Sequence, residues 1–150
     1  MSSLPSELLC RMNFEIDFAM VERVKTTVVI PIARGAVDGP KLSGSVVDGR
    51  MVGRWVAGAT EDRLEEEGIV TLRTHDDATI FMRMTAVTHG ERAELMKASA
   101  GGRPDPAHYH ARTVHRFEVA AEQYDWLNST IAVGVVELTP AGPSFELFAL

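Results

Sequence analysis

Residues 10–20 have the sequence Cys10-Arg11-Met12-Asn13-Phe14-Glu15-Ile16-Asp17-Phe18-Ala19-Met20. Every even position in this stretch is apolar, and most odd positions are polar. Successive side chains of an extended strand point to opposite faces, so this alternation gathers the apolar side chains on one face. The pattern predicts a half-buried strand over residues 10–20.

Similar segments follow at short intervals. Residues 26–32 are β-branched except at Pro31, and residues 69–75 and 79–88 predict a hairpin joined at Asp76-Asp77-Ala78. Further strands are expected over 94–99, 113–119, 130–139 and 145–150, with a turn or short helix over 120–128. The acidic run over 61–67 is typical of a solvated connection.

Glycine is frequent between the early strands, at Gly35, Gly39, Gly44 and Gly49. Glycines within strand-like sequence mark bulges, tight turns or close backbone approach, which allow a sheet to curl. Eight or nine short strands with little helical periodicity predict an all-β chain, either a barrel or a sandwich.

Composition limits the function classes. The chain has 150 residues, 15 basic and 21 acidic side chains and a formal charge of −6, which is typical of one globular domain over residues 1–150. It has no basic cluster for nucleic acid, no apolar run of membrane-spanning length and no secretion signal at its start. We therefore expect a cytoplasmic protein that binds neither nucleic acid nor membrane. Unpaired strand edges make a homodimer or higher homo-oligomer plausible.

Several motifs resemble the DUF3237 family, also called UPF0311, whose bacterial and fungal members are largely uncharacterised. The matching pieces extend from about Phe14 to the end of the chain and are Gly35, Gly39-Pro40-x-Leu42-x-Gly44, Gly49, the hairpin over 74–80, Tyr109, Arg112-Thr113, Phe117-Glu118 and Tyr124-x-Trp126-Leu127-Asn128. The resemblance implies a single small antiparallel β-barrel with an interior pocket.

Two positions depart from the family pattern. A Gly-x-Asp-Trp element is expected after the glycine stretch, whereas this chain has Gly53-Arg54-Trp55 without the aspartate. The hairpin turn has Asp77-Ala78 in place of Asp-Gly. Alanine disfavours positive φ, so a different turn type is expected there.

The histidines permit a metal hypothesis. His108 and His110 would lie on one side of a strand, and the preceding glycine spacing is similar to the start of the cupin metal motif. The rest of that motif is missing, because Phe145 stands where its last histidine belongs and His115 would face away from His110. A cupin-like mononuclear metal site at His108 and His110 is therefore the weakest of the three functional hypotheses given below, and we expect no cofactor. Cys10 lies on the apolar face of its strand, which favours a buried, inert thiol.

Polar residues among apolar ones are the candidates for a pocket site. Arg73 and Arg83 share one face of the hairpin, which is either solvated or an anion-binding wall. Arg112 and Glu118 share a face of one strand and could form a charge pair. Tyr124, Trp126 and Asn128 form either a structural plug or a ligand-binding wall.

Three functions are compatible with these residues. The first is a cofactor-independent isomerase, cyclase or lyase for a lipophilic carbonyl or phenolic compound, with Glu118 as acid or base and Arg112 and Asn128 stabilising oxygen charge. The second is a non-catalytic carrier of small hydrophobic ligands, and the third is the metal enzyme. Ligand contacts are expected from Arg73, Arg83, Tyr109, Tyr124, Trp126 and Trp55.

Overall fold

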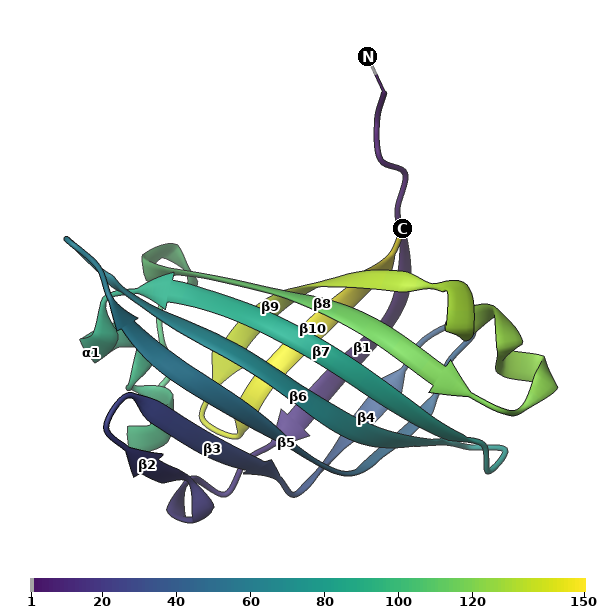
Figure 1. Ribbon diagram of the computed structural model, residues 1–150, viewed down its shortest axis with the longest axis horizontal. Helices are drawn as coiled ribbons and strands as arrows, with labels where there is room; N and C mark the ends of the chain where they lie inside the picture. The colour runs from purple at the N-terminus through teal and green to yellow at the C-terminus, as the bar shows by residue number, and fades with distance from the viewer. Residues whose placement is uncertain (1) are drawn as a thin grey trace.

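A computed structural model describes residues 2–150, and strands dominate it (Figure 1). The strands are β1 (Glu7–Glu15), β2 (Glu22–Val24), β3 (Thr27–Ile32), β4 (Arg34–Asp38), β5 (Gly44–Ala57), β6 (Asp62–Thr74), β7 (Thr79–Gly90), β8 (Tyr109–Val119), β9 (Ile131–Thr139) and β10 (Gly142–Ala149). The helical turns are short: η1 (Phe18–Met20), α1 (Arg92–Leu95), η2 (Ala98–Ala100), η3 (Pro106–His108) and η4 (Glu122–Ser129). None of these described helices has the length and apolar character needed to cross a bilayer.

The sheet closes on itself. Its strand order is β2-β3-β5-β4-β1-β10-β9-β8-β7-β6, every pairing given between neighbours is antiparallel, and β5 also pairs with β6. Eight strands therefore form a closed barrel, and β2 and β3 extend the wall beside the second half of β5. This confirms the predicted all-β barrel. The closed sheet of eight strands has no free edge.

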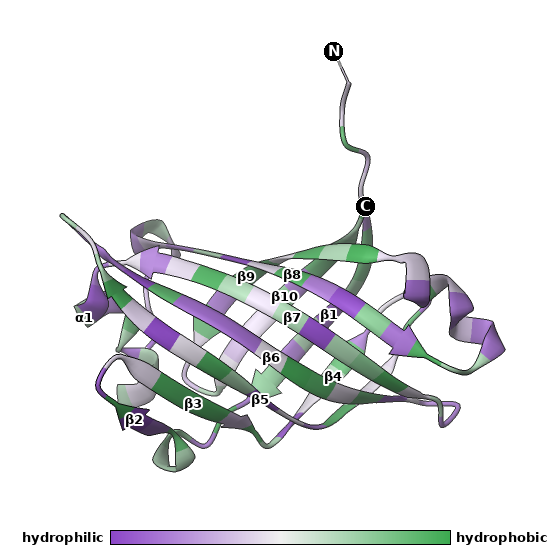
Figure 2. Cartoon of the chain, in the orientation of Figure 1, coloured by the Kyte–Doolittle hydropathy of each residue, from purple (hydrophilic) through white to green (hydrophobic). Residues whose placement is uncertain are grey.

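Alternation along the strands separates the barrel interior from its outer surface (Figure 2). On β7, Ile80, Met82 and Met84 are buried, whereas Phe81 and Arg83 between them are exposed. Apolar side chains from the inner face of nearly every strand form one continuous core. Burying this surface stabilises the fold by roughly 25 cal/mol for each Å² removed from water.

The two ends of the barrel differ (Figure 1). At one end, on the right of the view, η4 covers the interior and contributes Leu127, which is fully buried. At the other end, α1 and η2 lie over the opening, and buried Leu95 and Ala98 contact the interior. The η4 end is filled by core side chains, and the α1 end contains a cavity.

Three local predictions were wrong. The acidic run over 61–67 is not a connection, because β6 includes residues 62–67 and pairs with β5 and β7 there. Residues 94–99 contain the end of α1, a turn and the start of η2, and not a strand. Arg92, Ala93, Glu94 and Leu95 are strong helix formers. The first strand ends at Glu15, since the Asp17 side chain accepts a hydrogen bond from the backbone of Ala19 and begins η1.

The hairpin turn and the glycine stretch behave as predicted. Positive φ falls on Asp77 (69°) and not on Ala78, and aspartate tolerates this conformation better than alanine. The Thr74 hydroxyl accepts a hydrogen bond from the Ala78 amide at 2.8 Å. Between β5 and β6, the register shifts at Val46/Asp48, and a β-carbon at Gly35 would overlap the Asn13 carbonyl.

Candidate functional site

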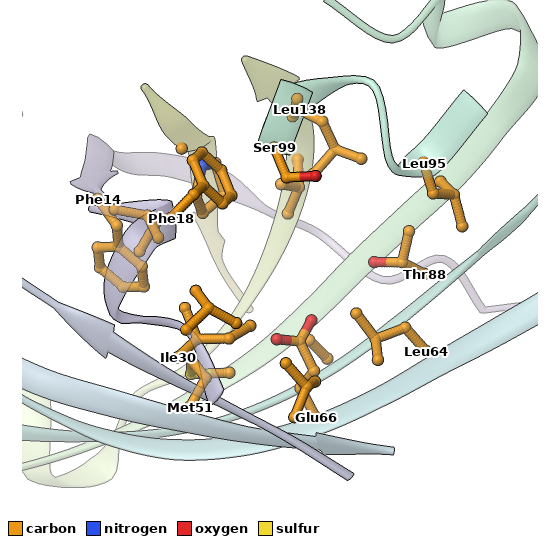
Figure 3. A pocket seen from close by; sticks show the side chains of 18 of the residues that line it. Phe14, Phe18, Ile30, Met51, Leu64, Glu66, Thr88, Leu95, Ser99 and Leu138 are labelled. Carbon is orange, nitrogen blue, oxygen red and sulfur yellow. The ribbon is translucent and has the colours of Figure 1, made fainter. Parts of the chain in front are cut away.

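A cavity of about 150 Å³ occupies the α1 end of the barrel (Figure 3). Its wall is mainly apolar, with Phe14, Ile30 and Met51 on one side and Leu64 and Leu95 on another. A cavity of roughly this volume accommodates a molecule the size of benzene. The cavity therefore suits a small lipophilic ligand.

One row of residues explains why this half of the barrel is hollow. Glu66 on β6 lies opposite Gly53 on β5 and Ala86 on β7, and Ala86 lies opposite Thr113 on β8, which lies opposite Gly134 on β9. Three of these five inward positions are glycine or alanine, so little side-chain volume fills the space between the strands. A β-carbon at Gly53 would lie 2.9 Å from Cγ of Glu66, which means that this glycine leaves room for the glutamate side chain.

Glu66 extends its carboxyl group into the cavity (Figure 3). Among the described residues it is the single acidic side chain that lines this space. Its surroundings are largely apolar, and this desolvation raises the pKa of Glu66 from 4.5 to about 7. At neutral pH the carboxyl group is therefore present in both its protonated and its ionised forms.

Besides Arg23, whose guanidinium donates to Sδ of Met96 at 3.7 Å, hydroxyl groups supply most of the other polarity of the cavity. The side chains of Thr88 and Ser99 point into the same space as the Glu66 carboxyl (Figure 3). Thr113 also lines the cavity, and its Oγ1 lies 2.7 Å from Nε2 of His115. These groups can orient a ligand through hydrogen bonds without adding charge.

Ionic contacts hold the segment that lies over the cavity. Arg92 lies over the ring of Trp55, 4.6 Å from its centroid, and pairs with Asp62 at 2.8 Å. Within α1, buried Glu94 accepts a hydrogen bond from the Asp105 amide at 2.6 Å and pairs with Lys97 at 2.6 Å. The bond from Asp105, followed by that from Lys97, lowers the pKa of Glu94. Glu94 thus ties the covering segment to the loop that precedes β8.

Of the nine predicted site residues, Trp55 is the one that lines the cavity. Arg73 and Arg83 share a face, as predicted, but it is the outer face, where their side chains are 47% and 64% exposed. The alternative of an interior anion-binding wall is therefore wrong.

Glu118 and Arg112 also point outward. Glu118 is 66% exposed and lies 4.0 Å from Arg83, and the guanidinium of Arg112 donates to the carbonyl of Ala111. The expected pairing of Arg112 with Glu118 is wrong, because six residues of extended strand separate their backbones by roughly 20 Å. Neither side chain can act on a molecule inside the barrel.

The aromatic and amide residues predicted to bind a ligand have structural partners. Asn128 exchanges two hydrogen bonds of 2.9 Å with the backbone of Val119, and the Tyr124 hydroxyl donates to Asp76 at 2.7 Å. Trp126 is exposed beside Lys41. The hydroxyl of Tyr109 accepts a hydrogen bond from the Leu138 amide. Asn128, Tyr124 and Trp126 belong to the η4 end, away from the cavity.

The histidines lie on different sides of the barrel wall. His108 and His110 are exposed, whereas His115 is fully buried, so His115 faces away from His110 as predicted. Within residues 2–150, no group of three His, Cys, Asp or Glu side chains is arranged to hold a metal ion. Cys10 is buried, and this burial, with a smaller effect of Asp38, raises the pKa of its thiol to about 12, as expected for an inert cysteine.

Sequence reasoning missed Glu66, although a signal was present. The buried positions Val70 and Leu72 set the inward parity of β6, and the same parity extended backward includes Leu64, Glu66 and Gly68. Because five of the seven residues over 61–67 are acidic, the alternation is not evident from the sequence there. An acidic residue in the inward register of a barrel strand indicates a pocket carboxyl group.

Together, the closed antiparallel sheet and its apolar cavity define a small β-barrel with an interior pocket. The chain belongs to the DUF3237 family, described as a protein of unknown function, whose family model matches residues 5–150. This confirms the resemblance seen in the sequence motifs.

Known relatives share the family or the fold. A UPF0311 protein of Rhodopseudomonas palustris is 28% identical over 110 residues, which cover 71% of this chain and 68% of that protein. A crystal structure of a conserved protein of unknown function from the same organism matches with a TM-score of 0.86, 22% identity and 99% coverage of both chains. A β-barrel-like protein of Acinetobacter baumannii matches with a TM-score of 0.74 and 24% identity, over 99% of this chain and 98% of that chain. A structure described as an enzyme from Penicillium herquei matches with a TM-score of 0.64 and 15% identity, also over 99% and 98%.

Proposed function

We propose that this protein is an enzyme that binds a small lipophilic compound in the barrel cavity and transfers a proton through Glu66. The observation that supports this proposal is the position of Glu66, the one acidic side chain among the described residues of an otherwise largely apolar cavity. The reaction class is an isomerisation, cyclisation or elimination of a carbonyl or phenolic compound. An isomerisation or cyclisation removes a proton at one atom and returns it at another, and an elimination removes a proton and can pass it to the departing group.

The environment of Glu66 suits this role. A general acid or base is most effective when its pKa lies near the working pH, and positioned proton transfer contributes roughly 10²–10⁴-fold to rate. Desolvation raises the pKa of Glu66 to about 7. The same carboxyl group can therefore accept a proton in its ionised form and donate one in its neutral form.

The rest of the cavity would position the substrate. The apolar wall suits an apolar substrate, and the hydroxyls of Thr88 and Ser99 point toward the space beside Glu66 (Figure 3). The Thr88 hydroxyl can donate to an oxygen that gains negative charge as a proton leaves the neighbouring atom. The Ser99 hydroxyl donates to the Met96 carbonyl at 2.8 Å, so toward a ligand it can act as an acceptor. The enzymatic description of the Penicillium herquei neighbour agrees with this proposal, which rests on the cavity of this chain.

A carrier of small hydrophobic molecules is the second candidate. Met51, Met84 and Met96 line the cavity, and methionine side chains adapt to ligands of irregular shape. A carrier needs the apolar wall but not the acid-base group. Substitution of Glu66 therefore separates the two functions.

The test compares the wild type, Glu66→Gln and the matched control Glu118→Gln on a panel of small lipophilic ketones and phenols in D₂O. Mass spectrometry would record deuterium incorporation and product formation. We expect the wild type and the control to process at least one compound, and Glu66→Gln to lose turnover by roughly 10²–10⁴-fold while still binding it. Full turnover by Glu66→Gln would contradict the role of Glu66, and binding without turnover across the panel would identify a carrier.

A further inference from the structure

The Thr113 and His115 pair connects the cavity to the buried core. Thr113 is 3% exposed and lines the cavity, whereas His115 is 0% exposed and lies behind it. Nε2 of His115 lies 2.7 Å from Oγ1 of Thr113, and Nδ1 lies 3.2 Å from Sδ of Met82. Each ring nitrogen has one polar partner. Phe145 packs edge-on against the imidazole.

The partners of His115 determine its tautomer. Desolvation lowers the pKa of His115 to about 4, so the ring is neutral at pH 7 and has one N–H group. A thioether sulfur accepts a hydrogen bond and cannot donate one. A proton on Nδ1 gives both ring nitrogens a partner, because Nδ1 then donates to Sδ of Met82 and Nε2 accepts from Oγ1 of Thr113. A proton on Nε2 would leave the lone pair of Nδ1 facing the sulfur, so the contacts favour the Nδ1 tautomer.

This tautomer fixes the direction of the hydroxyl of Thr113. A threonine hydroxyl has one proton and two lone pairs. The proton is donated to Nε2 of His115, so any hydrogen bond between Oγ1 and a ligand in the cavity must have Oγ1 as the acceptor. Gly134 permits this arrangement, since a β-carbon there would overlap Oγ1 of Thr113 and lie 3.2 Å from Nε2.

We propose that Thr113 selects ligands that donate a hydrogen bond, and that the substrates of the Glu66 site are small phenols or alcohols whose hydroxyl group docks on Oγ1 of Thr113. The inference rests on the proposed function, because it concerns the same cavity. Glu66 and Thr113 both lie opposite Ala86, one strand to each side, so their backbones are about 10 Å apart. A hydroxyl group bound at Thr113 would hold the rest of a small ring near the Glu66 carboxyl. A ligand whose polar atoms only accept finds no donor at Thr113.

The tautomer can be tested without a ligand. We expect ¹⁵N NMR of the wild type at pH 7 to show a protonated Nδ1 and an unprotonated Nε2 for His115. A protonated Nε2 would overturn the proposal, because the Thr113 hydroxyl would then be free to donate to an acceptor in the cavity.

The ligand preference is tested with phenol and anisole, which differ by replacement of the hydroxyl proton with a methyl group, and with toluene as the apolar reference. Calorimetric titrations would compare the wild type with Thr113→Val, which keeps the side-chain shape, and with Thr113→Ser, which keeps the hydroxyl. We expect the wild type and Thr113→Ser to prefer phenol over anisole by roughly threefold to tenfold, the usual effect of one hydrogen bond. We expect Thr113→Val to bind the two without preference.

The outcomes separate the inference from the proposed function. Binding of toluene and anisole with no phenol preference in the wild type, or a preference that survives in Thr113→Val, would overturn the role of Thr113 and leave the cavity as a ligand site. If Glu66→Gln abolishes the preference for phenol over anisole and Thr113→Val does not, the phenol hydroxyl group binds to Glu66. That result would also overturn the role of Thr113. If none of the three probes binds the wild type, the proposed function fails and this inference fails with it.

Discussion

The Glu66→Gln variant is expected to gain stability relative to the wild type as pH rises from about 4.5 to about 7. The folded-state pKa of Glu66, about 7, lies above its ordinary value of 4.5, so the folded protein binds this proton more tightly than the unfolded chain does. The stability from Glu66 is thus fully present below pH 4.5 and is lost as pH rises through 7. The expected change is on the order of 3 kcal/mol, because one pKa unit corresponds to about 1.4 kcal/mol.

His115 has the opposite sign. Desolvation lowers its pKa from 6.5 to about 4, so the unfolded chain binds the proton more tightly and the wild type loses stability as pH falls from 6.5 to 4. A His115→Gln variant should lack this loss, again on the order of 3 kcal/mol. In the wild type the effects of Glu66 and His115 on the free energy of unfolding largely cancel between pH 4.5 and 6.5. Each variant removes one effect, so the other can be measured.

Urea unfolding at a series of pH values would measure both effects. Glu67→Gln is the matched control for Glu66, because it removes a carboxylate from an exposed position of the same strand. Profiles of Glu66→Gln and wild type that differ by a constant amount across pH 4–8 would contradict the desolvation of this carboxyl group.

Gly134→Ala is expected to destabilise the protein by about 1–3 kcal/mol, the usual cost of overpacking a core. The added β-carbon would overlap Oγ1 of Thr113 and lie 3.0 Å from Cδ2 of Leu147. In a chain of this length, such a loss lowers Tm by roughly 2–4 °C for each kcal/mol. Gly102→Ala is the control, since its nearest neighbour, the Lys97 carbonyl oxygen, would be 3.3 Å away on a loop.

A double substitution identifies the cause of the Gly134 effect. Thr113→Ala alone leaves Nε2 of His115 without its donor, which costs about 1–3 kcal/mol. Thr113→Ala combined with Gly134→Ala also removes the overlap, so the pair should cost less than the sum of the single variants. Additive costs measured by thermal unfolding would mean that Gly134 does not act through Thr113.

The barrel could be predicted from local pattern because its strands alternate so regularly. Residues 10–15 and 79–88 show the period of two that is typical of strands with one buried face. The strands observed there bury the apolar face that this pattern predicts. The helices over 92–100 were missed because the segment is short and its main contact, Glu94 with Asp105, joins separate parts of the chain.

The site was predicted less well, for a physical reason. Alternation states which residues share a face but not which face is inside, and Glu118 and Arg112 are on the outer one. Glu66 is inside because β5 and β7 both pair with β6 along the acidic run, and because Gly53 leaves space for it. The pairings of β6 with β5 and β7 are long-range contacts, and they cannot be predicted from a single sequence.

The most direct test of the account is a ¹³C NMR titration of the side-chain carboxyl of Glu66 in the ligand-free wild type, with Glu66→Gln used to assign the resonance. A cavity carboxyl group that serves as acid and base at neutral pH should titrate with a midpoint near 7. A midpoint at the ordinary value of 4.5 would mean that Glu66 is solvated, and would contradict its proposed role as the proton-transfer group.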